Sequence, residues 1–239
     1  MSSSKSVTFS TKTACMGDTG LENAFKTIYG FDALHKESMH AISLLLLYGL
    51  PSPRHYYQSM WHAGDKQCSQ LKRIGNLGDG GKFVCMDALQ DPIRVLSVGS
   101  QGDFTFENDI LRHFPRAIIT TMDGTVSSSV AARAPPNVSF VRSNFDSSTQ
   151  VVNQLDILKI DCEGCELHAL MPFLSRTCVF QILLETHACM QPLQRHHALM
   201  TKLNHSFGVF VKEPNIEFSD GTCVEFGLLR RRPCKSRLH

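Results

Sequence analysis

The sequence lacks an excess of charge of either sign. Its 239 residues contain 24 lysines and arginines against 22 aspartates and glutamates, which gives a formal net charge of +2. So small a charge gives no argument for bulk binding to nucleic acid or to an anionic membrane. The dense basic run LLRRRPCKSRLH is interpreted as a solvated tail. We therefore expect no nucleic-acid partner.

A long hydrophobic run is also missing. The longest, AISLLLLYGL, is too short to span a bilayer, and it lies too far from the N-terminus to be a signal peptide. We expect a soluble, cytoplasmic chain. A secretory or anchored location is the alternative if the sequence is a fragment, and sequons at Asn137 and Asn204 keep it open. Nine cysteines, an odd number, in a chain of this size favour reduced thiols over a disulfide framework.

No internal repeat divides the chain, but its character changes near residue 66. Residues 1–65 form an extension that begins with a Ser-, Thr- and Lys-rich stretch, which predicts disorder. Apolar residues then recur at helical spacing between positions 20 and 50, which predicts a helix. Residues 66–239 form the second predicted unit, an α/β domain with a short basic tail.

From residue 70 onward the chain alternates between strand-like and helix-like segments. KRIGNLGDGGKFVCMD predicts a hairpin that turns at Asp79 and Gly80. Strands are predicted at 94–100, 117–123, 137–142, 156–161, 178–187, 208–214 and 222–230, and helices at 104–114, 147–155, 165–174 and 192–204. Alternating elements imply a parallel sheet with helices on both faces, and the closing pair of strands must be antiparallel. The predicted fold is a doubly wound, mostly parallel sheet with an antiparallel strand near its C-terminal edge.

The first strand-to-helix turn, VLSVGSQGDF, is rich in glycine. Gly99 and Gly102 let the backbone bend sharply and let a ligand approach, although a tight turn without a ligand explains them equally well. Asp123 ends the next strand, where an acid can accept hydrogen bonds from ribose hydroxyls; a turn or helix-cap aspartate is the alternative. Asn144 and Phe145 follow the third strand and could border an adenine, or form an Asx turn.

The segment DILKIDCEGCEL places ionisable side chains on alternate positions. Lys159, Asp161 and Glu163 therefore share one face of an extended strand. Glu185 and His187 end the following strand, LLETH, which should be its neighbour. Ligands bind at the carboxyl ends of such strands, and buried carboxylates require a cation, a proton or a donor. This predicts a site compensated by Lys159, a cationic ligand or a metal; a hydrated surface cluster is the alternative.

Two metal or redox interpretations remain alternatives. Asp161, Glu163 and His187 could bind a divalent metal, although no motif fixes the geometry. Cys162 and Cys165 form a C-x-x-C without a second pair, so half of a four-cysteine zinc site is missing. A structural pair of thiols is favoured over a redox motif.

Five stretches together resemble the FkbM-related, methyltransferase-like domains that use S-adenosylmethionine. The most specific is LKID-x-EG-x-E, and the others are IGNLGDGGKFVC, VLSVGSQGDFTFENDIL, QILLETH and VKEPNIEFSDGTCVEFGLL. They span about residues 66–230. The resemblance implies a Rossmann-like methyltransferase sheet with an inserted antiparallel strand. The glycine turn departs from the usual pattern, because Ser97 stands where an acid would precede G-x-G.

The resemblance also implies roles for particular residues. The implied cofactor contacts are Gly99, Ser100, Gly102 and Asp103, with Asp123 at the ribose, Asn144 and Phe145 at the adenine, and Asp161 facing the methionine part and the methyl group. For a hydroxyl acceptor, His187 is the first candidate base, because its ordinary pKa is near neutral. Glu185 or Asp161 could orient it, and Glu163 is the alternative base.

Two functions follow from these observations. The first is O-methylation of a small-molecule or sugar hydroxyl by a methyltransferase that uses S-adenosylmethionine. The second is a non-catalytic binding module that kept the fold and lost cofactor affinity, which the atypical turn favours. No motif specifies the methyl acceptor, the oligomeric state or a metal requirement.

Overall fold

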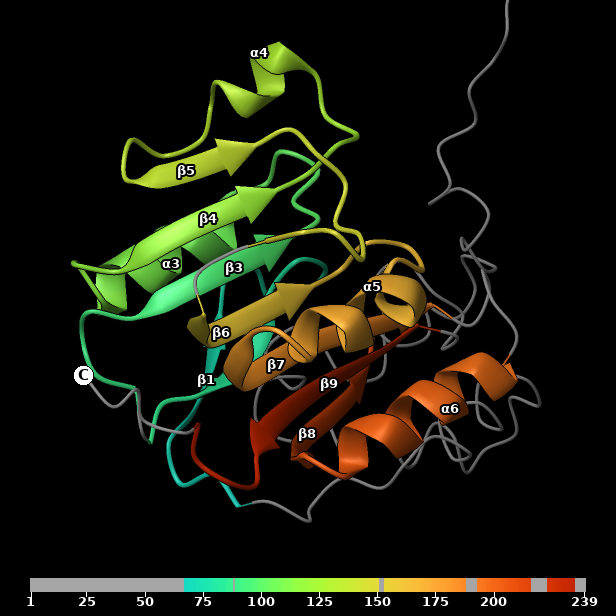
Figure 1. The fold of residues 1–239 in the computed structure, drawn as a ribbon. Coiled ribbons are helices and arrows are strands. Elements are labelled where there is room, and N and C mark those ends of the chain that lie inside the picture. The colour runs from blue at the N-terminus through green and yellow to red at the C-terminus, as the bar shows by residue number, and fades with distance from the viewer. Residues whose placement is uncertain (1–66, 88, 151–152, 188–192, 216–222, 235–239) are drawn as a thin grey trace, which may run out of the picture.

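A seven-stranded sheet forms the centre of the computed structural model, which describes residues 67–87, 89–150, 153–187, 193–215 and 223–234 (Figure 1). The strand order is β5-β4-β3-β6-β7-β9-β8. In chain order the strands are β3 (Arg94–Val98), β4 (Ile118–Met122), β5 (Val138–Val141), β6 (Gln154–Ile160), β7 (Cys178–His187), β8 (Phe207–Pro214) and β9 (Cys223–Arg230). β9 is antiparallel to both neighbours, β7 and β8, whereas the pairs from β5 to β7 are parallel. The predicted doubly wound sheet with an inserted antiparallel strand is confirmed.

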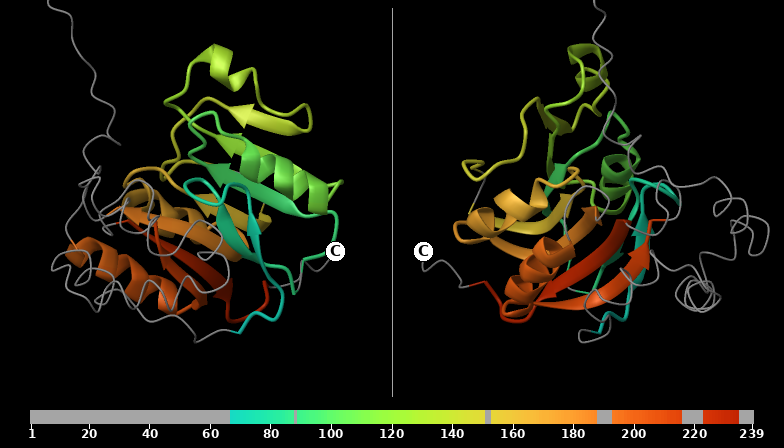
Figure 2. Two further views of the ribbon diagram at one scale, coloured as in Figure 1. Left: turned by 180° about the vertical axis from the view of Figure 1, so that it is seen from behind. Right: turned by 90° about the vertical axis from the view of Figure 1, so that its right-hand side faces the viewer.

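Two layers cover the sheet. Helices α5 (Glu166–Leu174) and α6 (Leu193–Asn204) lie on one face, and α3 (Thr105–His113) lies on the other with a hairpin of β1 (Leu71–Ile74) and β2 (Lys82–Cys85) (Figures 1 and 2). Successive side chains of β6 point to opposite faces of the sheet. Ile157 packs in the core beneath α3 and the hairpin, and Leu158 packs in the core beneath α5 and α6; both are fully buried. No helix in the described ranges is long and apolar enough to cross a membrane.

One buried amide helps to dock the hairpin onto the sheet. The Nε2 of Gln181 on β7 donates to the carbonyl oxygen of Cys85 (3.0 Å), and the N–H of Cys85 donates to its Oε1 (3.1 Å). Gln181 is fully buried. Its side chain thus gives the end of β2 the two hydrogen bonds that a neighbouring strand would supply. This contact fixes where the hairpin's side chains meet the sheet.

Most predicted elements are confirmed, including the hairpin, but the predicted helix at 147–155 is wrong. Ser147 and Ser148 form a turn, and β6 already begins at Gln154. The Asp146 carboxylate accepts the N–H of Ser148 (2.7 Å), and such a side-chain hydrogen bond favours a turn over a helix. The structure also contains a short unpredicted helix, α4 (Ser128–Ala131), where the Ser127 hydroxyl caps the N–H of Val130. The disordered start and the helix predicted within residues 1–65 lie outside the described residues.

The prediction of reduced thiols is wrong. Disulfides join Cys68 to Cys85, Cys162 to Cys165 and Cys178 to Cys234. Cys223 is the one described cysteine outside a disulfide, and it is buried. The parity of the cysteine count carries no information on pairing, because proximity in the fold decides it. Cys68 and Cys85, for example, are brought together by the antiparallel hairpin, with 5.8 Å between their Cα atoms.

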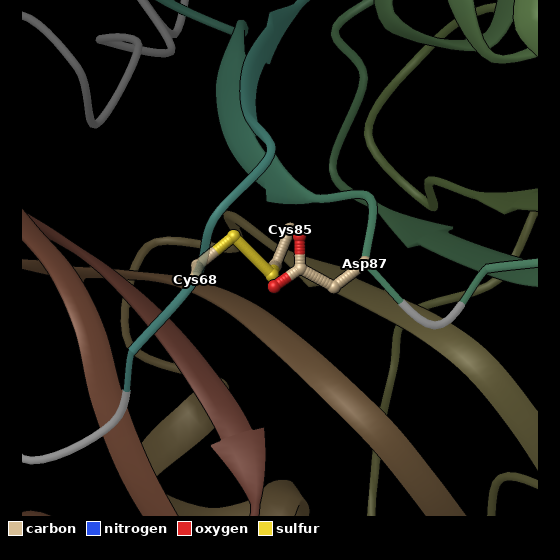
Figure 3. Close-up of side chains that lie close together, drawn as sticks. All are labelled: Cys68, Cys85 and Asp87. Atoms are coloured by element: carbon tan, nitrogen blue, oxygen red, sulfur yellow. A yellow bond between two sulfur atoms is a disulfide. The ribbon is translucent and has the colours of Figure 1, made fainter.

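Figure 3 shows this first disulfide beside the carboxylate of Asp87. The carboxylate accepts the N–H groups of Ser69 (2.8 Å) and Gln70 (2.7 Å). Desolvation opposes the effect of these hydrogen bonds, yet together the bonds lower the pKa of Asp87. The disulfide and the carboxylate both tie the segment before β1 to the end of β2, so this group of two cysteines and an acid has a structural explanation.

Candidate functional site

A cavity of about 1180 Å³ opens at the carboxyl ends of β3, β4 and β6. Typical ligand pockets measure roughly 300–1,000 Å³, so this cavity has room for a ligand larger than those that typical pockets bind. The predicted site residues in its lining are Gly99, Ser100, Asp103, Asp123, Asn144, Phe145, Asp161 and Glu163. Gly102, Glu185 and His187 were also predicted and lie outside that lining.

Two glycines of the glycine turn have backbone conformations that other residues rarely adopt. Gly99 has a φ of +77°, and a Cβ at this position would lie 1.7 Å from the carbonyl oxygen of Asp161. Gly102 has a φ of +81°, and a Cβ there would lie 2.2 Å from Cγ1 of Val130. The two glycines therefore let the turn approach the end of β6 on one side and α4 on the other.

Asp123 holds this turn in place. Its Oδ2 accepts the N–H groups of Ser100 (3.0 Å) and Gln101 (2.8 Å), and its Oδ1 accepts the N–H (2.8 Å) and hydroxyl (2.6 Å) of Thr125. Burial alone would raise the pKa of Asp123, but these hydrogen bonds lower it below the ordinary value. With the Ser100 hydroxyl 3.5 Å from Oδ2, five donors fill the roughly four lone-pair sites of this carboxylate. Asp123 thus supports the turn, and its contact with a ribose stays a prediction.

Lys159 supports the same turn. Its Nζ donates to the carbonyl oxygen of Gly99 (2.9 Å) and lies 5.8 Å from the centre of the Phe106 ring. The interpretation of Lys159 as the cation that compensates the carboxylates is therefore wrong. Lys159 and Ile157 lie on the same face of β6, the face that α3 covers. From this face the ammonium of Lys159 reaches the glycine turn.

The compensating cation is Lys82, from the hairpin strand β2. Its Nζ lies 2.5 Å from Oε1 of Glu225, 3.0 Å from Oε2 of Glu185 and 3.6 Å from Oδ2 of Asp161. The side chain is 3% exposed. Sequence reasoning missed both Lys82 and Glu225. The one available signal for Lys82 was its alternation with Val84, which places it on the buried face of a short strand.

The pKa values of this cluster follow from burial and from the shared lysine. Burial lowers the pKa of Lys82, but Glu185, Glu225 and Asp161 raise it well above its ordinary value. Burial raises the pKa of Glu185, and Lys82 and His187 then lower it to about 2. Burial and the charge of Glu185 raise the pKa of Glu225 well above its ordinary value, although Lys82 opposes them. Lys82 and Glu185 form the charged pair, and Glu225 is the carboxyl that most readily holds a proton.

His187, at the end of β7, lies among the carboxylates that follow β6, as the sequence predicts. Its Nε2 lies 3.6 Å from Asp161, 3.8 Å from Glu163 and 3.7 Å from Glu185, and its Nδ1 lies 3.9 Å from Glu166. The side chain is 4% exposed. Burial lowers the pKa of His187, but the surrounding carboxylates, led by Glu166, raise it to about 10.

The chain turns sharply after Asp161. Glu163 and Gly164 have φ values of +57° and +108°, and the Cys162–Cys165 disulfide closes the turn. The Oε2 of Glu166, at the start of α5, accepts the N–H of Gly164 (2.9 Å). This turn places Glu163 in the cavity lining. The predicted pair of thiols at Cys162 and Cys165 is wrong, because the two cysteines are joined in a disulfide.

A protein-family model described as a methyltransferase domain matches residues 33–123 and 136–230. The chain belongs to this methyltransferase family. No curated protein matches this chain. Membership bears out S-adenosylmethionine as the expected cofactor.

Several solved structures resemble this methyltransferase at low identity. One is a fibrillarin/Nop5p complex, with 14% identity over 59% of this chain and 74% of that chain, and a TM-score of 0.47. The N-methyltransferase NodS from Bradyrhizobium japonicum WM9 has 11% identity over 59% and 86% of the two chains, and a TM-score of 0.42. The plantazolicin methyltransferase BpumL in complex with SAH has 14% identity over 60% and 77%, and a TM-score of 0.43.

The cavity of the methyltransferase has the chemistry that S-adenosylmethionine requires. Phe145 and Val126 offer apolar surface for a purine, and the Asn144 amide lies beside them in the lining. Ser100 and Asp103 offer polar groups at the glycine turn, where hydroxyls and an amino-acid moiety can bind. Asp161 lies next to this turn and faces the carboxylate cluster. The residues present therefore fit the cofactor.

Proposed function

We propose that this methyltransferase transfers a methyl group from S-adenosylmethionine to a hydroxyl of a small molecule or a sugar. The observation that carries the proposal is one continuous cavity, lined by the glycine turn at Gly99 and Ser100 and by the carboxylates of Asp161 and Glu163. Bound S-adenosylmethionine supplies an electrophilic methyl group, which the acceptor oxygen takes while the electron pair of the broken S–C bond stays on sulfur. The chain's task is to align the acceptor with this methyl group, and such alignment is worth about 7–11 kcal/mol.

Glu163 is the proposed base. A hydroxyl acceptor loses a proton during the transfer, so a proton acceptor must lie at the cavity surface. Glu163 and Asp161 line the cavity, whereas His187 lies behind them and does not. His187 therefore positions the two carboxylates from a distance of 3.6–3.8 Å instead of touching the acceptor. Asp161, adjacent to the glycine turn, orients the acceptor hydroxyl.

Calorimetric titration of S-adenosylmethionine and S-adenosylhomocysteine into the full chain tests the cofactor, with NAD as the negative control. We expect micromolar binding of the first two. Asp123→Ala should abolish binding, because it releases the glycine turn. Asp156→Ala is the matched control, since Asp156 accepts the N–H of Arg94 at the far end of β6. No binding by the folded wild-type chain would favour the non-catalytic module, which the saturating hydrogen bonds at Asp123 also favour.

Methyl transfer to a panel of polyols, phenols and sugars tests the acceptor class. Glu163→Gln should keep the affinity for S-adenosylhomocysteine and lower kcat by about 10²- to 10⁴-fold, the usual contribution of a general base. Methylation of amines instead of hydroxyls would contradict the proposed acceptor. A specific relationship to FkbM proteins, suggested by LKID-x-EG-x-E, is part of the same proposal.

An oxidising compartment is the proposed location. Disulfides persist there and are rare in the cytoplasm of most cells, so the three disulfides favour it over the predicted cytoplasmic location. Mass-spectrometric mapping of protein isolated with thiols blocked at lysis tests this. Fully reduced cysteines in the native protein would favour the cytoplasm.

A further inference from the structure

Three side chains of types that can bind a metal lie close together on β7 and β9. Glu185, His187 and Cys223 each offer one donor atom, and the three atoms lie within 4.8 Å of one another. Glu185 and His187 alternate on β7 and so share a face, and the strand register sets Cys223 of β9 opposite His187. The three residues are 2%, 3% and 3% exposed. This cluster combines nitrogen, sulfur and oxygen donors in a buried place.

The spacing around His187 suits a bound ion better than direct hydrogen bonds. Its Nε2 faces oxygens of Asp161, Glu163 and Glu185 at 3.6, 3.8 and 3.7 Å. These separations are too long for N–H···O hydrogen bonds. Two ligands of one tetrahedral zinc ion, each about 2.0–2.2 Å from the metal, lie about 3.5 Å apart. The imidazole and the carboxylates are therefore separated by the distance that a shared ion requires.

The carboxylate of Glu166 faces the other ring nitrogen of His187, which is a second, independent observation. Its Oε1 lies 3.9 Å from the Nδ1 of His187. Both atoms are buried and neither has a hydrogen-bond partner. A metal-binding histidine typically directs its other ring nitrogen at a carboxylate, which fixes the ring orientation and the tautomer. The N–H of Gly164 holds the other oxygen of Glu166, so this carboxylate is positioned to orient His187.

The charge of the cluster also calls for a cation. Asp161, Glu163, Glu185 and Glu225 bring four carboxyl groups to one region, and Lys82 contacts three of them. Lys82 and the imidazole of His187 are the groups that face these carboxyls, and buried carboxylates are costly unless a cation compensates them. A divalent ion bound by the imidazole would supply positive charge to the same carboxylates.

We propose that His187, Glu185 and Cys223 bind one divalent ion of the zinc class, with the open fourth coordination position beside Asp161, on the side that faces the cavity. A set of imidazole, thiolate and carboxylate ligands favours zinc or cobalt over magnesium or calcium. Such an ion would polarise an acceptor hydroxyl held against Asp161 and ease loss of its proton. That catalytic role rests on the proposed function, whereas the binding site does not.

Cobalt titration of the chelator-stripped full chain, kept oxidised, tests the site. We expect one Co²⁺ per chain, a thiolate-to-cobalt charge-transfer absorption, displacement by Zn²⁺, and no competition from Mg²⁺. Cys223→Ser should remove this absorption, while Cys15→Ser and Cys189→Ser should keep it. His187→Ala should weaken Co²⁺ binding at least tenfold, and His168→Ala, in the cavity lining, is its matched control.

A parallel titration with S-adenosylhomocysteine distinguishes the metal site from the proposed function and shows whether the chain is folded. Binding of S-adenosylhomocysteine without binding of Co²⁺ or Zn²⁺ at millimolar concentration would overturn the metal site and leave the proposed function standing. Metal binding without binding of S-adenosylhomocysteine would remove the proposed catalytic role alone. An unchanged charge-transfer absorption in Cys223→Ser, a nearly isosteric variant, would overturn the assignment of the ligands.

Discussion

Lys82 on the hairpin and Glu185 on the central sheet form a buried ion pair, with 3.0 Å between Nζ and Oε2, although 103 residues separate them in the chain. The same ammonium contacts Glu225 and Asp161. Asp161 lines the cavity, and so do Asp79 and Gly80 of the hairpin turn, so the hairpin contributes to the site both through Lys82 and directly. A side chain that holds three carboxylates together should be difficult to replace.

Lys82→Met tests this arrangement. The variant keeps much of the side-chain volume but leaves buried carboxylates without their cation, and breaking a buried pair in this way costs about 3–5 kcal/mol. We expect the free energy of unfolding in denaturant to fall by that amount. Lys72→Met is the matched control, since Lys72 lies on the same hairpin and is exposed. Equal stability of the two variants would contradict the role of Lys82.

Gly99→Ala should abolish cofactor binding and destabilise the fold. The new Cβ would collide with the carbonyl oxygen of Asp161 at 1.7 Å and would force a side chain into a φ of +77°. Gly80→Ala separates the two effects, because Gly80 has a φ of +81° but its nearest neighbour, Oδ2 of Asp103, is 3.6 Å away. The control should lose only about 1–2 kcal/mol from backbone strain. Comparable losses in both variants would show that the close approach to Asp161 is unimportant.

The alternation of strands and helices and half of the site were predictable from the sequence, because they follow from local periodicity. DILKID and LLETH each place two ionisable side chains on alternate positions at a strand end, and parallel neighbours bring such ends together. Lys82 was not predictable in this way. Its contact with Glu185 depends on how the hairpin docks, through Gln181, across a sheet that is distant in the sequence.

The other errors have separate causes. The Asp146 carboxylate bonds the backbone of Ser148, and that local bond outweighs the helix pattern of residues 147–155. Lys159 and Asp161 do follow the same alternation, but the glycine turn offers the lysine a carbonyl at 2.9 Å, so the ammonium serves the turn. Cysteine pairing required the three-dimensional fold, since Cys178 and Cys234 are 56 residues apart.

The three disulfides should contribute unequally to stability. Cross-links stabilise mainly by restricting the unfolded chain, and this effect grows with the length of the closed loop. The sequence separations are 56 for Cys178–Cys234, 17 for Cys68–Cys85 and 3 for Cys162–Cys165. Paired serine substitutions should therefore lower the free energy of unfolding by about 4, 3 and less than 2 kcal/mol respectively. Denaturant unfolding without reductant measures the order, and a reversed order would show that local packing dominates.

Asp123 should make the protein less stable in acid. Because hydrogen bonds from Thr125, Gln101 and Ser100 lower its folded-state pKa below the ordinary value of 3.8, the unfolded chain binds the proton more readily. The stabilisation is therefore fully present above pH 3.8 and is lost as the pH falls through the lower folded-state pKa. Urea unfolding across this range should show a smaller loss of stability for Asp123→Asn than for wild type. Thr125→Val, which removes the hydroxyl donor at 2.6 Å, should give an intermediate loss. Identical pH dependence in all three proteins would mean that the turn is held by something other than the Asp123 carboxylate.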